Sequence, residues 1–191
     1  MNVERFKTKN IEILKTKILD LDLKGCVFLN NYSHSEKIAK TFCKVSRLGD
    51  GTFWYGMLGA VWLMKGVEYS DRIAYITAGA SIGTLIYKAL KKKTVRPRPY
   101  QVHQVIKLGE RPLDHFSFPS GHTLHAVMIT SILGYIAPPL LFIMVPFTGL
   151  VAASRMILGL HYPTDVLMGA LIGGSVATLV ISSAPVFHMV L

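Results

Sequence analysis

Three ionisable residues stand at fixed offsets inside an apolar run near the end of the chain. The run 154–165 contains Arg155, His161 and Asp165. Because Pro163 suits the first turn of a helix, His161 is expected to precede that helix and Asp165 to lie one turn into it. Asp165 could then accept a hydrogen bond from one ring nitrogen of His161, which leaves the other nitrogen free to attack an electrophile.

Each of these groups also has an explanation without chemistry. A histidine and an aspartate four residues apart are common as a local pair where a helix begins. An arginine near the end of a membrane helix, such as Arg155, can extend its charge to the surface while its stem stays apolar. Ionisable groups within membrane segments are costly, however, and by default indicate a functional site.

Two further stretches supply groups of the same chemical kind. The run 91–99 combines a cluster of cations with two prolines that hold the backbone extended, although it also suits a basic flank of a membrane helix. The run 119–122 opens a helix, with Ser120 as candidate cap and backbone N–H groups free to bind an anion. Together the stretches offer cations, a helix N-terminus, two histidines and a carboxylate, which phosphoryl transfer requires.

The composition is that of a membrane protein. The chain has 191 residues, of which 51% are hydrophobic and 17% charged, and the long apolar runs come after residue 50. Lys and Arg outnumber Asp and Glu by 21 to 11, which suits anionic lipid or an anionic substrate. No nucleic-acid-binding signature accompanies the basic residues, so nucleic acid is not an expected partner. The two cysteines have neither disulfide-framework nor zinc spacing.

Five apolar segments predict an all-α fold, a polytopic membrane helix bundle with about five transmembrane helices. The expected helices cover residues 52–64 with extensions at both ends, 73–90, 120–138, 140–159, and 163 to beyond 180. Gly169 and Gly173 would let the last helix pack closely against a neighbour. Residues 100–118 form a polar connection without a helical period.

Residues 1–48 are expected to form an amphipathic N-terminal helical segment, and residues 49–191 the membrane-embedded domain. Apolar residues recur at helical spacing in the first part, at Ile11, Leu14, Ile18 and Leu21. This pattern predicts a basic amphipathic helix lying on the membrane. A second helix is expected near Ser33, where Ser33 and Glu36 have capping-box spacing, packed either on lipid or on the protein.

The alternation of helix directions gives a check on the site. If residues 1–50 do not cross the membrane, one side receives the N-terminus, the end of the second membrane helix, the start of the third, the end of the fourth and the start of the fifth. The stretches 91–99, 119–122 and 154–165 all fall there. The sequence therefore predicts that all three meet at one membrane face.

The three stretches resemble the signature of the type-2 phosphatidic acid phosphatase family, the lipid phosphate phosphatases related to vanadium haloperoxidases. The matching motifs are Lys91-x6-Arg98-Pro99, Pro119-Ser120-Gly121-His122 and Ser154-Arg155-x5-His161-x3-Asp165. The resemblance covers roughly residues 47–185. It implies an integral membrane phosphatase that removes a terminal phosphate from a lipid phosphate or diphosphate through a phosphohistidine intermediate. It also implies that no metal or other cofactor is needed.

The resemblance assigns a role to each site residue. The groups that would bind phosphate oxygens are Lys91, Arg98, Arg155, Ser120 and the backbone of Gly121. His161 would be the nucleophile, Asp165 would orient it, and His122 would protonate the departing lipid oxygen. Neighbouring polar residues keep open roles, namely Lys92, Lys93, Arg96, His103, His115 and His125. Of these, Arg96 is expected to hold the loop or contact the membrane surface.

The substrate and the membrane face stay open at this stage. Candidate substrates are undecaprenyl diphosphate, phosphatidylglycerophosphate, phosphatidic acid and a lipid A phosphate, with residues 100–118 reading the headgroup. All 21 Lys and Arg residues except Lys65 and Arg72 fall on the side of the site, which by the positive-inside rule would be cytoplasmic. The family's usual orientation instead implies the outer, periplasmic face of a bacterial cytoplasmic membrane. The oligomeric state is not indicated.

Two other functions remain compatible with the same residues. A vanadate-dependent haloperoxidase would use a similar pocket, but its small aqueous substrate needs no bilayer-length helices. A non-catalytic membrane protein that binds anionic lipid would keep the pocket without turnover. Release of phosphate from a lipid phosphate would distinguish the phosphatase from both.

Overall fold

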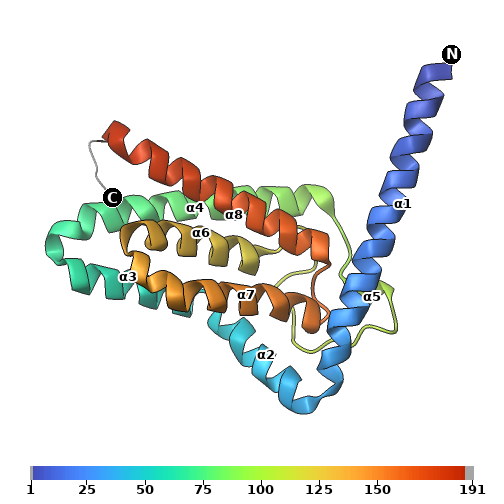
Figure 1. The fold of residues 1–191 in the computed structure, drawn as a ribbon, viewed down its shortest axis with the longest axis horizontal. Coiled ribbons are helices and arrows are strands. Elements are labelled where there is room, and N and C mark those ends of the chain that lie inside the picture. The colour runs from blue at the N-terminus through green and yellow to red at the C-terminus, as the bar shows by residue number, and fades with distance from the viewer. Residues whose placement is uncertain (1, 188–191) are drawn as a thin grey trace.

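The computed structural model describes residues 2–187, which form an all-helical fold and confirm the expected fold class (Figure 1). The α-helices are α1 (Asn2–Asn30), α2 (Glu36–Leu48), α3 (Thr52–Lys65), α4 (Ser70–Thr94), α5 (Pro99–Val102), α6 (Gly121–Ile136), α7 (Leu141–Ile157) and α8 (Pro163–Ser183). Short 3-10 turns connect several of them at Asn31–His34, Val67–Tyr69 and Pro138–Leu140, and a fourth, Ala184–Phe187, follows α8.

Helix α6 lies at the centre of the bundle. It contacts α3, α4, α7 and α8, and the ribbon shows these helices running roughly alongside it (Figure 1). Leu124, Met128 and Ile132 on α6 are completely buried. A helix that is apolar on all sides is stable only when neighbours cover it. The bundle therefore holds the start of α6, where Ser120 and His122 lie, in a fixed position.

Among the residues that the structure describes, three helical segments are long and apolar enough to cross a membrane. They are Val67–Val102, Pro138–Ile157 and Pro163–Phe187. Helices α3 and α6 have 14 and 16 residues, which is shorter than the roughly 20 residues that a bilayer requires. The five expected apolar helices are thus all present, and three reach bilayer length. Large apolar side chains on their outer faces, such as Phe142 and Leu179, are exposed and suit contact with lipid.

Most helix starts follow their local sequence signals, but one expectation was wrong. Ser120 is the N-cap of α6, and its hydroxyl accepts a hydrogen bond from the backbone of Thr123. The predicted capping box at Ser33 is not formed, since α2 begins at Glu36 with Ser35 as its N-cap. The tight turn after α1 takes up residues 31–34, which moves the cap two residues along and buries Ser33.

Helices α6 and α8 approach so closely that their backbones nearly touch, as the two glycines predicted. A Cβ atom at Gly169 would lie 2.5 Å from the carbonyl oxygen of Ser120, and one at Gly173 would lie 2.4 Å from that of Leu124. The backbone N–H of Ser120 also donates to the carbonyl of Asp165 at 3.0 Å. The close approach joins the start of α6 to the first turn of α8.

Helix α1 crosses the end of the bundle at a steep angle (Figure 1). It contacts α7 and α8, and its apolar residues Ile11, Leu14, Ile18 and Leu21 remain exposed, as a membrane-surface helix requires. Buried Asn30 at its end donates from Nδ2 to the carbonyls of Ile157 at 2.8 Å and Lys107 at 2.9 Å. It thereby attaches the 103–118 loop to the end of α7.

Candidate active site

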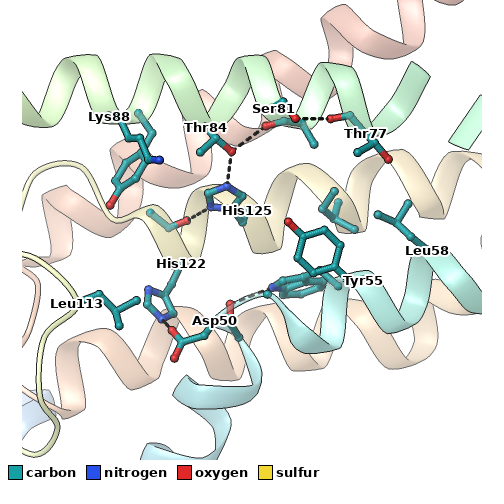
Figure 2. Close-up of a pocket in the computed structure, with 17 residues that line it drawn as sticks. Asp50, Tyr55, Leu58, Thr77, Ser81, Thr84, Lys88, Leu113, His122 and His125 are labelled. Carbon is teal, nitrogen blue, oxygen red and sulfur yellow. Dashed lines mark hydrogen bonds and ion pairs between the residues drawn. The ribbon is translucent and has the colours of Figure 1, made fainter. Parts of the chain in front are cut away.

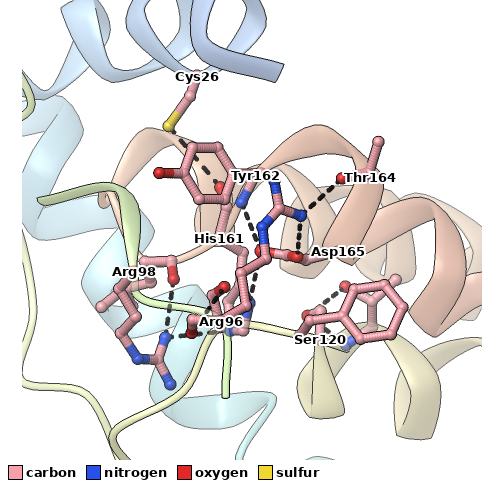
Figure 3. A network of polar contacts seen from close by, with 12 residues as sticks. Cys26, Arg96, Arg98, Ser120, His161, Tyr162, Thr164 and Asp165 are labelled. Carbon is pink, nitrogen blue, oxygen red and sulfur yellow. Dashed lines mark hydrogen bonds and ion pairs between the residues drawn. The ribbon is translucent and has the colours of Figure 1, made fainter. Parts of the chain in front are cut away.

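The three polar stretches meet at one end of the bundle, as the alternation of helix directions predicted. The last turn of α4, the start of α6, the end of α7 and the start of α8 gather there, beneath the crossing α1 (Figure 1). Figure 3 shows residues from all three stretches in one network. The predicted site residues are mostly buried at this end, including Lys91, Arg98, Arg155, His161 and Asp165.

His161 lies between a carboxylate and a cation. Its Nδ1 is 3.6 Å from Oδ2 of Asp165, which is longer than a hydrogen bond, and it has no hydrogen-bond partner among the described residues. Its Nε2 lies 3.3 Å from Nη1 of Arg98. His161 and Asp165, which were expected to act together, thus lie side by side without a hydrogen bond between them. Catalytic hydrogen bonds are often long before substrate binds.

Asp165 is held by its other neighbours. Its Oδ1 accepts from Nη1 of Arg96 at 2.7 Å, and its Oδ2 accepts from the backbone of Tyr162 at 2.8 Å (Figure 3). Arg96 also donates to buried Asp22 of α1 at 2.6 Å and lies over the ring of Tyr162. Arg96 therefore holds the loop, as expected, but does so by bridging two buried carboxylates.

Lys91 and Arg98 share one carboxylate that the sequence did not single out. Asp114 accepts from Nζ of Lys91 at 2.7 Å through Oδ2 and from Nη2 of Arg98 at 2.7 Å through Oδ1. Tyr87 donates to the same carboxylate at 2.9 Å. Partial burial raises the pKa of Asp114, but hydrogen bonding and charge from Lys91 outweigh it, so the pKa lies below its usual range. An ionised carboxylate thus lies where two cations could hold phosphate oxygens.

Arg155 is 2% exposed and retains unused hydrogen-bonding capacity. Its Nη1 donates to Ser46 of α2 and lies 3.9 Å from Oε2 of Glu110. Its Nε has no partner within the described part of the chain. A buried donor without a partner is costly, and an anion bound beside it would remove that cost.

The start of α6 offers backbone N–H groups for anion binding, whereas the side chain of Ser120 already has a partner. The hydroxyl of Ser120 is completely buried and pairs with Oγ1 of Thr123 at 2.9 Å, so it is already engaged in capping. The first N–H groups of a helix, here from Gly121 onward, have no intrahelical acceptor. They can bind an anion together with the helix dipole.

His122 pairs with a residue from outside the three stretches. Its Nε2 contacts Oδ1 of Asp50, which lies in the loop between α2 and α3 (Figure 2). The sequence shows this aspartate only as part of a Gly-Asp-Gly break. An acidic residue between two glycines at the site end of a membrane helix could have suggested a role. The contact spans 72 residues, so no local pattern reveals it.

The cations lower the proton affinity of His161. Its pKa is held well below the usual range because burial disfavours the imidazolium and because Arg155, Arg98 and Lys91 repel its charge, with a smaller effect from His122. The ring is therefore neutral near neutral pH. The charges of Arg155, Arg98 and Lys91 thus all act on the His161 ring.

An apolar pocket of about 290 Å³ opens beside His122 (Figure 2). Its walls come from three helices and include Trp54 and Leu58 of α3, Thr77, Ser81 and Thr84 of α4, and Ile129 of α6. The hydroxyls of Thr77, Ser81 and Thr84 donate to carbonyls of their own helix. The pocket leads from the outer surface of α4, where Ser81 is exposed, to the polar end of the bundle.

The remaining polar residues take minor places. Lys92, Lys93 and His115 are exposed, and His103 packs edge-on against Tyr162. His125 pairs with the carbonyl of Gly121 and with Thr84, as expected for a packed histidine. Within the described residues, no group of three His, Cys, Asp or Glu side chains could hold a metal ion.

Comparison with known proteins finds a family model and relatives that are named as phosphatases. The PAP2 superfamily model matches residues 72–188. Decaprenylphosphoryl-5-phosphoribose phosphatase of Mycobacterium tuberculosis is 33% identical over 104 residues, which cover 54% of this chain and 56% of that protein. Undecaprenyl-diphosphatase BcrC of Bacillus subtilis is 31% identical over 111 residues, covering 58% and 57%. The chain thus spans little more than half the length of these relatives.

Two solved structures share the fold. The crystal structure of Aquifex aeolicus LpxE superposes with a TM-score of 0.73 and 26% identity, covering 85% of this chain and 95% of that one. The transmembrane PAP2-type phosphatidylglycerolphosphate phosphatase of Bacillus subtilis gives a TM-score of 0.67 and 22% identity, covering 88% and 84%. The second likeness extends to the fold alone.

Proposed function

Because this chain belongs to the PAP2 superfamily, we propose that it is an integral membrane lipid phosphatase that removes the terminal phosphate from a lipid phosphate or diphosphate. One observation carries the proposal. Buried Arg155, whose Nε has no partner among the described residues, lies at the same end of the bundle as buried Lys91, Arg98 and His161, next to an apolar pocket. Cations and a nucleophile suit a phosphate, and the pocket suits a lipid chain.

The geometry supports a two-step mechanism. Lys91, Arg98, Arg155 and the first N–H groups of α6 would hold the phosphate oxygens. Nε2 of His161 lies on the side of Arg98, so it is the nitrogen that would attack phosphorus. The bond to the lipid oxygen would break, and His122 would supply the proton to that oxygen. Water would then attack the phosphohistidine and release inorganic phosphate.

Asp165 would act on the other nitrogen of His161. A shortening of the 3.6 Å separation between Nδ1 and Oδ2 would form the hydrogen bond that fixes the tautomer and stabilises positive charge as phosphorus is attacked. Arg96 and the backbone of Tyr162 already fix the Asp165 carboxylate. The histidine ring therefore needs only a small movement to complete the pair.

Polyprenyl phosphates are the first substrates to test. The relatives from Mycobacterium tuberculosis and Bacillus subtilis are named for decaprenyl-linked and undecaprenyl-linked phosphates. The lining of the apolar pocket includes exposed Ser81 of α4 as well as Leu113 of the loop 103–118, so a long chain could enter sideways past α4. Phosphatidylglycerophosphate, phosphatidic acid and a lipid A phosphate complete the panel.

The membrane and its face are part of the proposal. We place the protein in a bacterial cytoplasmic membrane with the site at the outer face, following the family's usual orientation. The distribution of Lys and Arg favours the opposite face. Labelling of His115→Cys, in a background lacking Cys26 and Cys43, with a membrane-impermeant maleimide would decide between the two, because His115 is exposed at the site end.

The test of function is phosphate release from the purified full chain in detergent. Wild type should release phosphate from at least one lipid of the panel, continue to do so with chelator present, and be inhibited by vanadate, which mimics the pentacoordinate phosphate. His161→Asn serves as the blank and should lose turnover. Full activity in that variant would refute the phosphohistidine mechanism, and binding without release would indicate a non-catalytic protein.

A further inference from the structure

Asp50 and His122 come from different parts of the chain and meet at the inner end of the apolar pocket (Figure 2). Asp50 follows α2, whereas His122 lies in the first turn of α6, and both line the pocket. The carboxylate contacts Nε2 of the imidazole, and the two side chains are 33% and 10% exposed. None of the three motifs includes Asp50.

The loop that carries Asp50 is fixed by its surroundings. The indole of Trp54 donates to the carbonyl of Gly49 at 3.1 Å. A Cβ at Gly49 would lie 3.1 Å from Val151 of α7, so the backbone packs directly on that helix. Gly51 has φ +131°, which L side chains rarely adopt. The turn thus holds the aspartate in one place against the bundle.

Charges around His122 oppose its protonation, except for the one on Asp50. Burial lowers the pKa of His122 to about 4, with Arg155 of α7 and, to a smaller extent, His125 of α6 acting in the same direction, while Asp50 acts in the opposite one. Asp50 is the carboxylate in contact with the ring. A histidine that must carry a proton in this setting needs that partner.

We infer that Asp50 positions His122 and favours its protonated form, so that the ring can donate a proton to the departing lipid oxygen. This inference rests on the proposed phosphatase function. Asp50 would hold Nε2–H, which leaves Nδ1–H to face the substrate. As the phosphorus–oxygen bond breaks, the Nδ1 proton moves to the lipid oxygen, and His122 becomes neutral while still donating from Nε2 to Asp50. The loop after the N-terminal segment would then belong to the active site.

Esters with different leaving groups can distinguish a role of Asp50 in proton transfer from a purely structural role. An alcohol such as dodecanol needs a proton to depart, because its pKa is close to the value of about 15.7 for water. A phenol has a pKa of about 10, like tyrosine, and departs with much less help. Dodecyl phosphate and 4-octylphenyl phosphate therefore differ in their need for the acid. The value of kcat/KM covers the steps up to alcohol release and is the quantity to compare.

Asp50→Asn should lower kcat/KM for dodecyl phosphate by about 100-fold, within the range that general acids contribute. The loss for 4-octylphenyl phosphate should be less than about tenfold, which also shows that the variant folds. Asp50→Glu should recover part of the lost activity. Asp71→Asn, an exposed aspartate at the far end of the bundle, is the matched control and should resemble wild type with both esters.

A double-mutant cycle with His122→Ala completes the test. If Asp50 acts through His122, Asp50→Asn should cause no further loss in the His122→Ala background. Equal losses with both esters, or losses that multiply in the double variant, would overturn the inference and leave the proposed function intact. Absence of phosphate release by wild type, or activity retained in His161→Asn, would overturn both.

Discussion

The guanidinium of Arg96 and the carboxylate of Asp165 form an ion pair in which Nη1 and Oδ1 lie 2.7 Å apart. Arg96 is two residues from Arg98, yet the two arginines have different surroundings. Arg98 faces Nε2 of His161, whereas Arg96 faces the carboxylate proposed to orient that histidine. Arg98 has φ −78° and ψ 153°, which is close to polyproline II geometry. Because the polyproline II helix has about three residues per turn, side chains two residues apart lie on different faces of it.

The first prediction concerns the stability that Arg96 provides. Arg96→Met would leave Asp22 and Asp165, both nearly completely buried, without their shared cation. Breaking such a pair costs about 3–5 kcal/mol. Thermal unfolding in detergent should show a clear decrease in the midpoint, and Asp22→Asn in the same chain should restore part of it. Exposed Lys92→Met is the control, and a stable Arg96→Met variant would contradict this role.

The second prediction concerns Asp114, which lies on the cations that would bind phosphate. An anion must displace or share the carboxylate that bridges Lys91 and Arg98. Asp114→Asn removes that competition, so the inhibition constant for orthovanadate should fall several-fold, up to about tenfold for 1.4 kcal/mol. Asp20→Asn, which breaks an exposed pair with Lys24 on α1, should not change it. Weaker vanadate binding in Asp114→Asn would show that the carboxylate supports the site instead.

The third prediction is the pH dependence of attack by His161. Burial and the nearby Arg155 lower the pKa of His161, so the neutral nucleophile persists as the pH falls. The acid limb of kcat/KM should therefore lie below the ordinary histidine value of about 6.5. Stopped assays with the aryl ester, which depends little on the acid, isolate this limb. An acid limb at or above that value would mean that the cations do not act on the ring as the structure indicates.

The fourth prediction tests sideways access of the lipid chain. Ser81 is exposed at the outer side of the pocket, and Ser81→Phe would place a ring across the opening. The KM for a long-chain phosphate should rise by about tenfold or more, whereas a short-chain ester should be affected much less. Thr178→Phe on α8 is a matched control, since Thr178 is also exposed and bonds the carbonyl four residues earlier. Equal effects on both chain lengths would argue against this route.

The fold could be predicted largely from the sequence because its signals are local. Apolar runs ended by Pro or Gly gave the five bundle helices, and Pro163 and Ser120 began theirs where expected. Local signals failed at Ser33, where two similar serines compete for one cap and the tight turn selects Ser35. The short helix α5 was also missed, since the four residues Pro99–Val102 are too few for a periodic pattern.

The candidate site was predictable only for residues inside the motifs. The spacing of the motifs and the alternation of helix directions predict that Lys91, Arg98, Arg155 and His161 share one site. Residues outside the motifs contact the site as well: Asp114 contacts Lys91, Ser46 contacts Arg155, Asp50 contacts His122 and Asp22 contacts Arg96. All four make contacts across the fold rather than along one helix. Single acidic or hydroxyl residues in loops and amphipathic helices carry no period that would single them out.

The contact of Gly169 with Ser120 divides the site into a fixed part and an adjustable part. The spacing between α8 and the start of α6 is set by main-chain atoms, because a Cβ atom added at Gly169 would lie only 2.5 Å from the carbonyl oxygen of Ser120. Substitution there would shift the oxygen-binding N–H groups relative to His161. The loop 103–118 is fixed at points such as Lys107 and Asp114, but Leu108, Leu113 and His115 between and beside them are exposed. A protein engineer who wants a new headgroup preference should therefore randomise the exposed positions of this loop and leave the helix pair untouched.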